Sequence, residues 1–319
     1  MASPRPSSSR SSASWPTDAS ATVAGVAFAT LGTNLAAFLA HEAGAWRGDD
    51  PDAVHDMRVA SRRIRAAMSL FSDALPDDLA ECRGELKWVA SDLGAVRDLD
   101  VQLEQIRSWT EDMDPEEADS LKSLLALIED RRRAARARLV ETLESDRYAR
   151  LVASLRAAVA LGPEDDGLPA ARTPITDFAP PVLERRYRRV RAMGKRLTRS
   201  SDPTEFHALR IRAKRLRYGI EFVRGVYPKS SKRMVRRLVA LQDLLGEHQD
   251  AQVAMGHLRA LADDPDLGLS ARALLALGRV TERYERHAAE LRRGFRPTFD
   301  RIPGKPWKRF RREMRRAGG

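Results

Sequence analysis

The chain has a single cysteine, Cys82, few aromatic side chains and no long aliphatic run in its 319 residues. One cysteine cannot form an intramolecular disulfide, which excludes a disulfide-stapled scaffold and favours a reducing, cytoplasmic compartment. Aromatic residues make up 6% of the chain, which is few for a protein that stacks single-stranded bases. Residues 22–40 are mostly apolar, but threonine, glycine and asparagine interrupt them. We therefore expect a buried helix there and no transmembrane segment.

Local motifs of common active sites are missing as well. The sequence has no Gly-rich phosphate loop, nucleophile elbow or zinc-binding helix motif. Its six histidines and one cysteine do not have the spacing of metal ligands. We therefore expect a binding protein and not an enzyme, with no cofactor and no metal. An enzyme acting on phosphate polymers is the less favoured alternative.

Positive charge is what the chain has in excess. It carries 56 Lys and Arg against 45 Asp and Glu, for a net charge of +11. Residues 182–237 carry +15 and residues 294–319 carry +7, so the remainder carries −11. Of the 56 cations, 48 are arginine, whose planar fork binds phosphate. A polyanion is the expected partner; the alternative is a protein that uses arginine wherever others use lysine.

Apolar residues recur at helical spacing, and no alternating strand pattern is present. Breaks such as Asp50-Pro51 and Asp202-Pro203 suit helix starts, because aspartate caps and proline tolerates the first turn. The sequence thus predicts an all-α protein. The expected helices cover 19–46, 52–74, 78–109, 115–160, 180–199, 204–225, 229–262 and 266–294.

A long internal repeat has a constant offset of 152 residues. Six positions are identical between residues 50–71 and 202–223, and Leu-Gly, Asp and Val recur at the same offset further on. A constant offset across two helices indicates a tandem duplication with a unit of about 150 residues. The pairs are Asp50/Asp202, Pro51/Pro203, His55/His207, Arg58/Arg210, Arg63/Arg215, Arg65/Arg217, Leu93/Leu245, Gly94/Gly246, Asp98/Asp250 and Val101/Val253.

Four helices per unit predict two tandem antiparallel four-helix bundles related by internal pseudo-twofold symmetry. The first bundle covers 19–161, a linker covers 162–174 and the second bundle covers 175–294. Residues 1–18 read as a disordered tail, with a transit peptide as the alternative. Residues 295–319 form a basic C-terminal tail.

At about 100° per residue, the repeated helix has one cationic face and an opposite apolar stripe. No acid occurs at the repeated positions of this face. Asp98 and Asp250 can orient one or two of its arginines from a neighbouring helix, and we expect the rest to face an external polyanion. The face consists of His55, Arg58, Arg62, Arg63 and Arg65 in the first copy and His207, Arg210, Lys214, Arg215 and Arg217 in the second.

Of the six histidines, only His55 and His207 recur at the offset. Within an arginine face we expect each to donate a hydrogen bond to phosphate. Metal ligation and phosphoryl acceptance are the alternatives, and neighbouring cations oppose the first. Gly94 and Gly246 lie inside expected helices, where glycine costs about 1 kcal/mol. They mark either close helix packing or a local helix break.

These residues resemble the CHAD family, which is named for conserved histidines in an α-helical domain. The resemblance covers residues 20–294 and rests on four motifs in order. It implies two four-helix bundles with a basic groove between them, lined by the two cationic faces, and binding of inorganic polyphosphate. The motifs are His55-Asp-Met-Arg-Val-Ala-Ser-Arg-Arg-Ile-Arg, Val96-Arg-Asp-Leu-Asp-Val, His207-Ala-Leu-Arg-Ile-Arg-Ala-Lys-Arg-Leu-Arg-Tyr and Leu241-Gln-Asp-Leu-Leu-Gly-Glu-His-Gln-Asp.

Many members of that family also carry a triphosphate-tunnel domain with a Glu-x-Glu-x-Lys signature. This sequence has no such signature, so the resemblance does not imply hydrolysis. Some relatives sit on polyester storage granules, which makes granule association a second expected location. Polyphosphate has only backbone charge, and the repeated faces hold one aromatic residue, Tyr218, in one copy. Polyphosphate is therefore favoured over RNA.

The C-terminal tail supports an alternative function. Trp307, Phe310 and Met314 form an i, i+3, i+7 stripe inside a strongly basic segment. Such a segment docks on nucleic acid or on an anionic granule or membrane surface, or it packs back on the bundle. The surrounding cations are Lys308, Arg309, Arg311, Arg312, Arg315 and Arg316.

Overall fold

The fold is all-α, as the sequence predicts. The computed structural model describes residues 18, 20–48, 50–111, 121–163 and 168–318, and its only extended pairing there is an isolated bridge between Thr22 and Pro174. The α-helices are α1 (Val23–Ala40), α2 (Glu42–Arg47), α3 (Pro51–Leu70), α4 (Asp78–Thr110), α6 (Lys122–Glu144), α7 (Asp146–Leu161), α8 (Pro169–Arg172), α9 (Ile175–Arg196), α10 (Pro203–Phe222), α11 (Pro228–Ala262), α12 (Ala271–Phe299) and α13 (Lys305–Ala317). Two short 3-10 turns cover Ser72–Ala74 and Pro265–Leu267.

The two repeated helices begin in the same way. Asp50 accepts a hydrogen bond from the backbone N–H of Asp52 at 2.9 Å, and Asp202 accepts one from that of Thr204 at 2.8 Å. In both helices proline occupies the first turn, where no helical N–H partner is needed. Both helices are 20 residues long, so the 152-residue offset holds at both ends.

Several helix boundaries differ from the expected ones. The helix expected over 115–160 is interrupted at Ser145, whose extended backbone (ψ 146°) ends α6 and whose hydroxyl caps α7; its first residues, 115–120, lie outside the described residues. The expected linker contains α8, and the carbonyl of Thr173 accepts a hydrogen bond from the N–H of Val23 at 2.9 Å. The tail over 1–18 lies outside the described residues except for residue 18.

In the second half, α9 starts at Ile175 and contains Pro180 and Pro181. Ile175, Ala179 and Leu183 are buried around the two prolines. This burial keeps the first turns of α9 helical, because tertiary packing supplies most of a helix's stability. The last expected helix, 266–294, instead begins at residue 271 and continues to residue 299.

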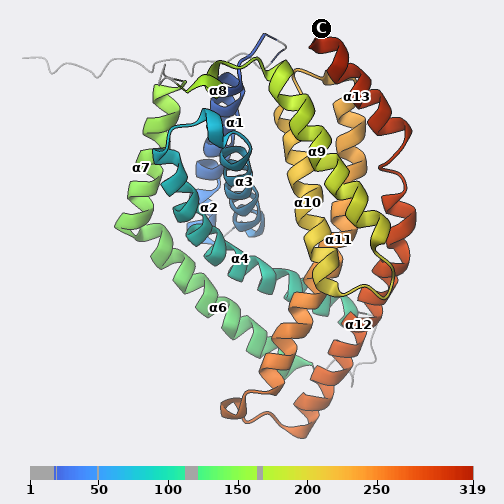
Figure 1. Ribbon diagram of the computed structural model, residues 1–319. Helices are drawn as coiled ribbons and strands as arrows, with labels where there is room; N and C mark the ends of the chain where they lie inside the picture. The colour runs from blue at the N-terminus through green and yellow to red at the C-terminus, as the bar shows by residue number, and fades with distance from the viewer. Residues whose placement is uncertain (1–17, 19, 49, 112–120, 164–167, 319) are drawn as a thin grey trace, which may run out of the picture.

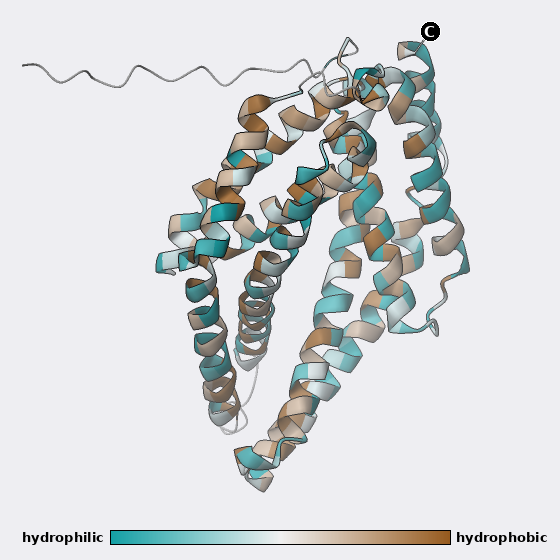
Figure 2. Cartoon of the chain, turned by 60° about the vertical axis from the view of Figure 1, so that its left-hand side comes forward, coloured by the Kyte–Doolittle hydropathy of each residue, from teal (hydrophilic) through white to brown (hydrophobic). Residues whose placement is uncertain are grey.

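The helices form two groups that meet at α3 and α10 (Figure 1). Helices α1, α2, α3 and α7 lie on one side, α9, α10 and α13 lie on the other, and α4 and α6 run obliquely toward α11 and α12 (Figure 1). A single hydrophobic cluster runs through both groups, and hydrophilic and hydrophobic residues are interspersed along most helices (Figure 2). The pseudo-twofold relation between the two bundles remains a prediction.

The stretch Val23–Arg47 is long and apolar enough to cross a membrane by length and composition, and 56% of its apolar window is buried inside the protein. Helix α1 packs against α3, α7 and α8. Phe28, Leu31 and Phe38 from this helix are at most 3% exposed. This face of α1 is thus buried against neighbouring helices.

The basic C-terminal segment folds as a helix against the second half. Trp307, Phe310 and Met314 are at most 4% exposed, and the ring of Trp307 stacks on that of Tyr187 with centroids 3.8 Å apart. Helix α13 contacts both α9 and α11. Its apolar stripe is thus part of the core, as the packing alternative predicted.

Candidate polyanion-binding site

The candidate site begins with two arginines that lie over two glycines. A Cβ added to Gly94 would be 3.5 Å from Nε of Arg58, and one added to Gly246 would be 3.6 Å from Nη2 of Arg210. Helices α4 and α11 continue unbroken through these glycines, so the local helix break is wrong. The close neighbour is in each case a guanidinium group from the repeated helix.

One helical turn after each glycine comes the repeated aspartate. Asp98 lies 3.8 Å from Nη2 of Arg58. Burial lowers the pKa of Arg58 and Arg210, and the nearby Asp98 and Asp250 partly oppose that effect. Burial raises the pKa of Asp250, and its attraction to Arg210 acts in the opposite direction. Both aspartates are thus close enough to these arginines to act on them electrostatically, and their orienting role stays a prediction.

Cations outnumber acids where the two halves meet. Helix α3 contacts α10, and α4 contacts α11. We call the resulting group, Arg58, Arg62, Arg210 and Lys214 with Asp98 and Asp250, the central cationic cluster. Burial and the repulsion of the three arginines lower the pKa of Lys214 to about 6, against the weaker attraction of Asp250. Three arginines and a lysine whose pKa is lowered thus share two carboxylates in a partly desolvated space.

The two repeated histidines flank this cluster. Burial lowers the pKa of His55, and the charges of Arg97, Arg62 and Arg58 add to this effect. His55 is therefore neutral at pH 7 and available as a hydrogen-bond donor. Nδ1 of His207 lies 2.6 Å from Oε1 of Gln249, which holds its ring against α11. Among the described residues, no group of three or more His, Cys, Asp or Glu side chains is arranged to hold a metal ion.

Two of the predicted site residues belong to a separate ion-pair group around Glu221. Arg63 donates to Oε2 of Glu221 at 2.6 Å and to Oδ1 of Asn34 at 2.9 Å. Arg217 lies 3.6 Å from the other carboxylate oxygen of Glu221. Glu221 does not recur in the internal repeat, because the residue at the 152-residue offset is Ser69. The repeat therefore gives no signal for this acid. Arg63 therefore joins α3 to α10 through Glu221, Arg217 pairs with Glu221 within α10, and both arginines are already neutralised in part.

The last two predicted residues lie away from the central cationic cluster. Burial lowers the pKa of Arg65, and repulsion from Arg83 of α4 lowers it further. Arg215 is exposed, and its backbone carbonyl accepts a hydrogen bond from Arg186 at 2.6 Å. The structure thus brings together four of the eight repeated cations and separates the other four.

Two residues near the cluster did not figure among the predicted site residues. The charge of Arg97 lowers the pKa of both His55 and Arg58. Its position next to the repeated Asp98 is the sequence feature that could have identified it. Tyr218 is 2% exposed, and its hydroxyl accepts a hydrogen bond from Nε of Arg62 at 2.8 Å. Tyr218 therefore fixes an arginine and is not a platform for stacking bases.

A family model described as the CHAD domain matches residues 29–259 of the chain. The chain belongs to the CHAD domain family. The crystal structure of the CHAD domain from the plant Ricinus communis is 28% identical in sequence, with a TM-score of 0.73, and the match covers 91% of this chain and 95% of that one. The family and the all-α fold expected from the four motifs are thereby confirmed.

Another solved structure and two curated proteins are also similar to this chain. PptA from Streptomyces chartreusis shares the fold of this CHAD domain at 19% identity, with a TM-score of 0.68 and coverage of 87% of this chain and 99% of that one. Two uncharacterized proteins of Mycobacterium tuberculosis, from strains CDC 1551 and H37Rv, are each 30% identical over 223 residues. That match covers 66% of this chain and 41% of each relative, so the chain spans about two fifths of their length.

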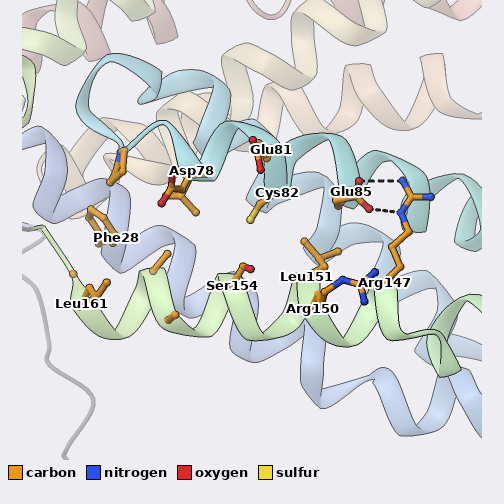
Figure 3. Close-up of a pocket in the computed structure, with 15 residues that line it drawn as sticks. Phe28, Asp78, Glu81, Cys82, Glu85, Arg147, Arg150, Leu151, Ser154 and Leu161 are labelled. Atoms are coloured by element: carbon orange, nitrogen blue, oxygen red, sulfur yellow. Dashed lines mark hydrogen bonds and ion pairs between the residues drawn. The ribbon is translucent and has the colours of Figure 1, made fainter.

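A pocket of about 740 Å³ lies apart from the predicted site, between α4 and α7 of this CHAD domain (Figure 3). Phe28, Leu79 and Leu151 contribute apolar surface, and an ion pair of Glu85 with Arg147 closes one end. Burial raises the pKa of the Cys82 thiol in its wall. None of the repeated histidines or cations lines this pocket, so the candidate site remains at the junction of α3 and α10.

Proposed function

We propose that this CHAD domain binds inorganic polyphosphate at the central cationic cluster. The observation that carries the proposal is the matched pair of arginines, Arg58 and Arg210, each lying over a helical glycine beside a repeated aspartate. With Arg62 they place three arginines beside two acids in a partly buried space, next to Lys214, whose protonated form the ligand would favour. Partly desolvated cations without enough counter-charge are unfavourable, and an external polyanion offsets that cost.

The chemistry of polyphosphate suits this arrangement. A phosphate chain offers charge at every unit and no base edge or sugar, so its recognition needs fixed cations and no base-reading groups. Asp98 and Asp250 hold the guanidinium groups in place before the ligand arrives, and such preorganisation lowers the entropic cost of binding. Neutral His55 adds a hydrogen-bond donor at the edge of the cluster. We propose a cytoplasmic binding module that does not hydrolyse its ligand.

The test compares two triple variants that remove equal charge. Arg58→Gln, Arg62→Gln and Arg210→Gln change the central cationic cluster, whereas Lys87→Gln, Arg150→Gln and Arg156→Gln change exposed cations of the first half. The probe is long-chain polyphosphate, titrated at several salt concentrations. We expect the cluster variant to lose polyphosphate affinity by about a hundredfold and its salt slope to fall by about 2–3, while the control changes by less than about threefold.

Circular dichroism checks that both variants keep the helical signal. If the cluster variant is folded and binds polyphosphate as well as the control does, the proposed site is wrong. If neither variant nor the unaltered protein binds polyphosphate, the proposed ligand is wrong. Phosphate release from polyphosphate during incubation would contradict the non-catalytic role.

A further inference from the structure

We propose that the solvent-facing side of α13 is a second binding surface that docks duplex nucleic acid through its phosphate backbone. This surface is independent of the central cationic cluster. It is formed by six exposed cations of one helix, which we call the outer cationic face. They are Lys305, Lys308, Arg309, Arg312, Arg315 and Arg316.

The packing of α13 produces this face. Trp307, Phe310 and Met314 turn the apolar side of the helix into the core. At about 100° per residue, the six cations then share one arc on the opposite side. The row from Lys305 to Arg316 is about 17 Å long at the α-helical rise. No acid interrupts this arc.

Both remaining polar positions of α13 face its neighbours and are already occupied. Arg311 lies 3.7 Å from Glu184 of α9. Glu313 accepts a hydrogen bond from the backbone N–H of Lys229, at the start of α11, at 2.9 Å. In the described part of the chain, by contrast, none of the six cations of the outer cationic face forms an ion pair. Arg311 and Glu313 thus have partners on the neighbouring helices, whereas the outer cationic face has no ion-pair partner among the described residues.

Neighbouring helices extend the positive surface on both sides. Arg188 and Arg191 are exposed on α9, and Lys229 and Lys232 are exposed on α11, the two helices that α13 contacts. Packed helices lie about 8–10 Å apart. The cations of these two helices therefore widen the positive surface beyond the row on α13.

The composition of the face favours a duplex over other polyanions. Its aromatic residues, Trp307 and Phe310, are buried, so it offers no stacking platform for single-stranded bases. The same burial leaves no apolar side to enter a membrane interface. The cations of this face are exposed, whereas those of the central cationic cluster are partly buried. Contacts to the phosphate backbone carry no sequence information, so we expect binding that does not depend on base sequence.

The test uses the full chain and a labelled, mixed-sequence DNA duplex of two helical turns in fluorescence anisotropy. The variant carries Lys308→Gln, Arg312→Gln and Arg315→Gln, and the matched control carries Lys87→Gln, Arg150→Gln and Arg156→Gln. Each removes one lysine and two arginines, all exposed. We expect the α13 variant to lose duplex affinity by about tenfold or more and its log–log salt slope to fall by about 2–3, since each lost phosphate contact lowers it by about 0.9. The control should change affinity by less than about twofold.

Three further probes decide between the remaining partners. The same strand without its complement should bind more weakly than the duplex, and vesicles of equal parts phosphatidylcholine and phosphatidylserine should not bind. The cluster variant Arg58→Gln, Arg62→Gln, Arg210→Gln should keep its duplex affinity, which separates this surface from the proposed polyphosphate site. Equal losses in the α13 variant and the control, unchanged duplex binding by the α13 variant, or binding to vesicles alone would each overturn the proposal.

Discussion

Nε of Arg62 in α3 donates a hydrogen bond to the hydroxyl of Tyr218 in α10 at 2.8 Å. The bond joins the two repeated helices across the junction of the two halves. Because Tyr218 is buried, its hydroxyl is a fixed acceptor that holds Arg62 beside Lys214 and Arg58. A hydrogen bond to a charged group contributes about 1.5–3 kcal/mol.

Replacing Tyr218 with phenylalanine should therefore weaken both folding and binding. Tyr218→Phe leaves Arg62 without this acceptor, and we expect the free energy of unfolding to fall by about 1.5–3 kcal/mol and polyphosphate affinity to fall several-fold. Denaturant titration and polyphosphate binding measure the two effects. The matched control is Tyr227→Phe, because the buried hydroxyl of Tyr227 has no hydrogen-bond partner among the described residues. A loss of the same size in both variants would contradict the role of Tyr218.

Substitution of Gly94 should depend on the size of the new side chain. Alanine would place Cβ 3.5 Å from Nε of Arg58, an ordinary contact, and would raise helix stability by up to about 1 kcal/mol. We expect Gly94→Ala to be at least as stable as the unaltered protein and to bind polyphosphate. Gly94→Leu should displace the Arg58 guanidinium and weaken binding while the helical signal persists.

Gly194 provides the contrasting case for the same experiment. A Cβ there would lie 2.1 Å from the ring of Phe299, which is fully buried. Such overpacking costs about 1–3 kcal/mol or more, so Gly194→Ala should lower the melting temperature while Gly94→Ala does not. Equal effects at the two glycines would show that Arg58 does not lie over Gly94 as described.

The stability of the protein should depend on pH through Lys214. Burial and the charges of Arg62, Arg210 and Arg58 lower its folded-state pKa to about 6, with Asp250 acting in the opposite direction. Between that value and the ordinary lysine pKa, the unfolded chain binds more protons than the folded one, so stability rises with pH in this window. Lys214→Met should therefore stabilise the protein most below pH 6, and the gain should shrink as pH rises.

Polyphosphate binding should also be linked to protonation of Lys214, but the ligand should raise the pKa of Lys214, which folding lowers. A phosphate chain beside Lys214 favours its charged form, so polyphosphate binding at pH 7–8 should be accompanied by proton uptake. Titration calorimetry in buffers of different ionisation enthalpy measures the number of protons. The uptake should fall in Lys214→Met, and an unchanged value there would assign it to another group.

Removal of Trp307 should release α13 from the second half. Its ring stacks on Tyr187 and is 4% exposed, and truncation of such a residue costs about 3–5 kcal/mol. We expect Trp307→Ala to lower the melting temperature strongly and to increase proteolysis within Lys305–Ala317. Trp46→Ala is the control, because the indole of Trp46 is 47% exposed and donates one hydrogen bond to Glu144. Its effect should be under about 1 kcal/mol.

The sequence predicted the local features of the fold well. The caps at Asp50 and Asp202 and the helix starts beside them follow from interactions within a few residues. The repeat is read directly by comparing the two segments of the sequence. The extension of α9 through Pro180 and Pro181 and the helix end at Ser145 were missed. In the first case burial of neighbouring apolar residues outweighs a local preference, and in the second a single serine cap looks like any surface residue.

By itself, the sequence determined the helical class, the duplicated unit and the cations available for a polyanion, because periodicity, capping and charge are properties of neighbouring residues. Only the tertiary structure decided which cations converge. In the folded protein Arg58 and Arg210 lie over glycines, and Arg63 forms an ion pair with Glu221. The apolar stripe of α13 packs into the core. Those outcomes depend on how helices distant in sequence are oriented against one another, and a one-dimensional pattern does not contain that orientation.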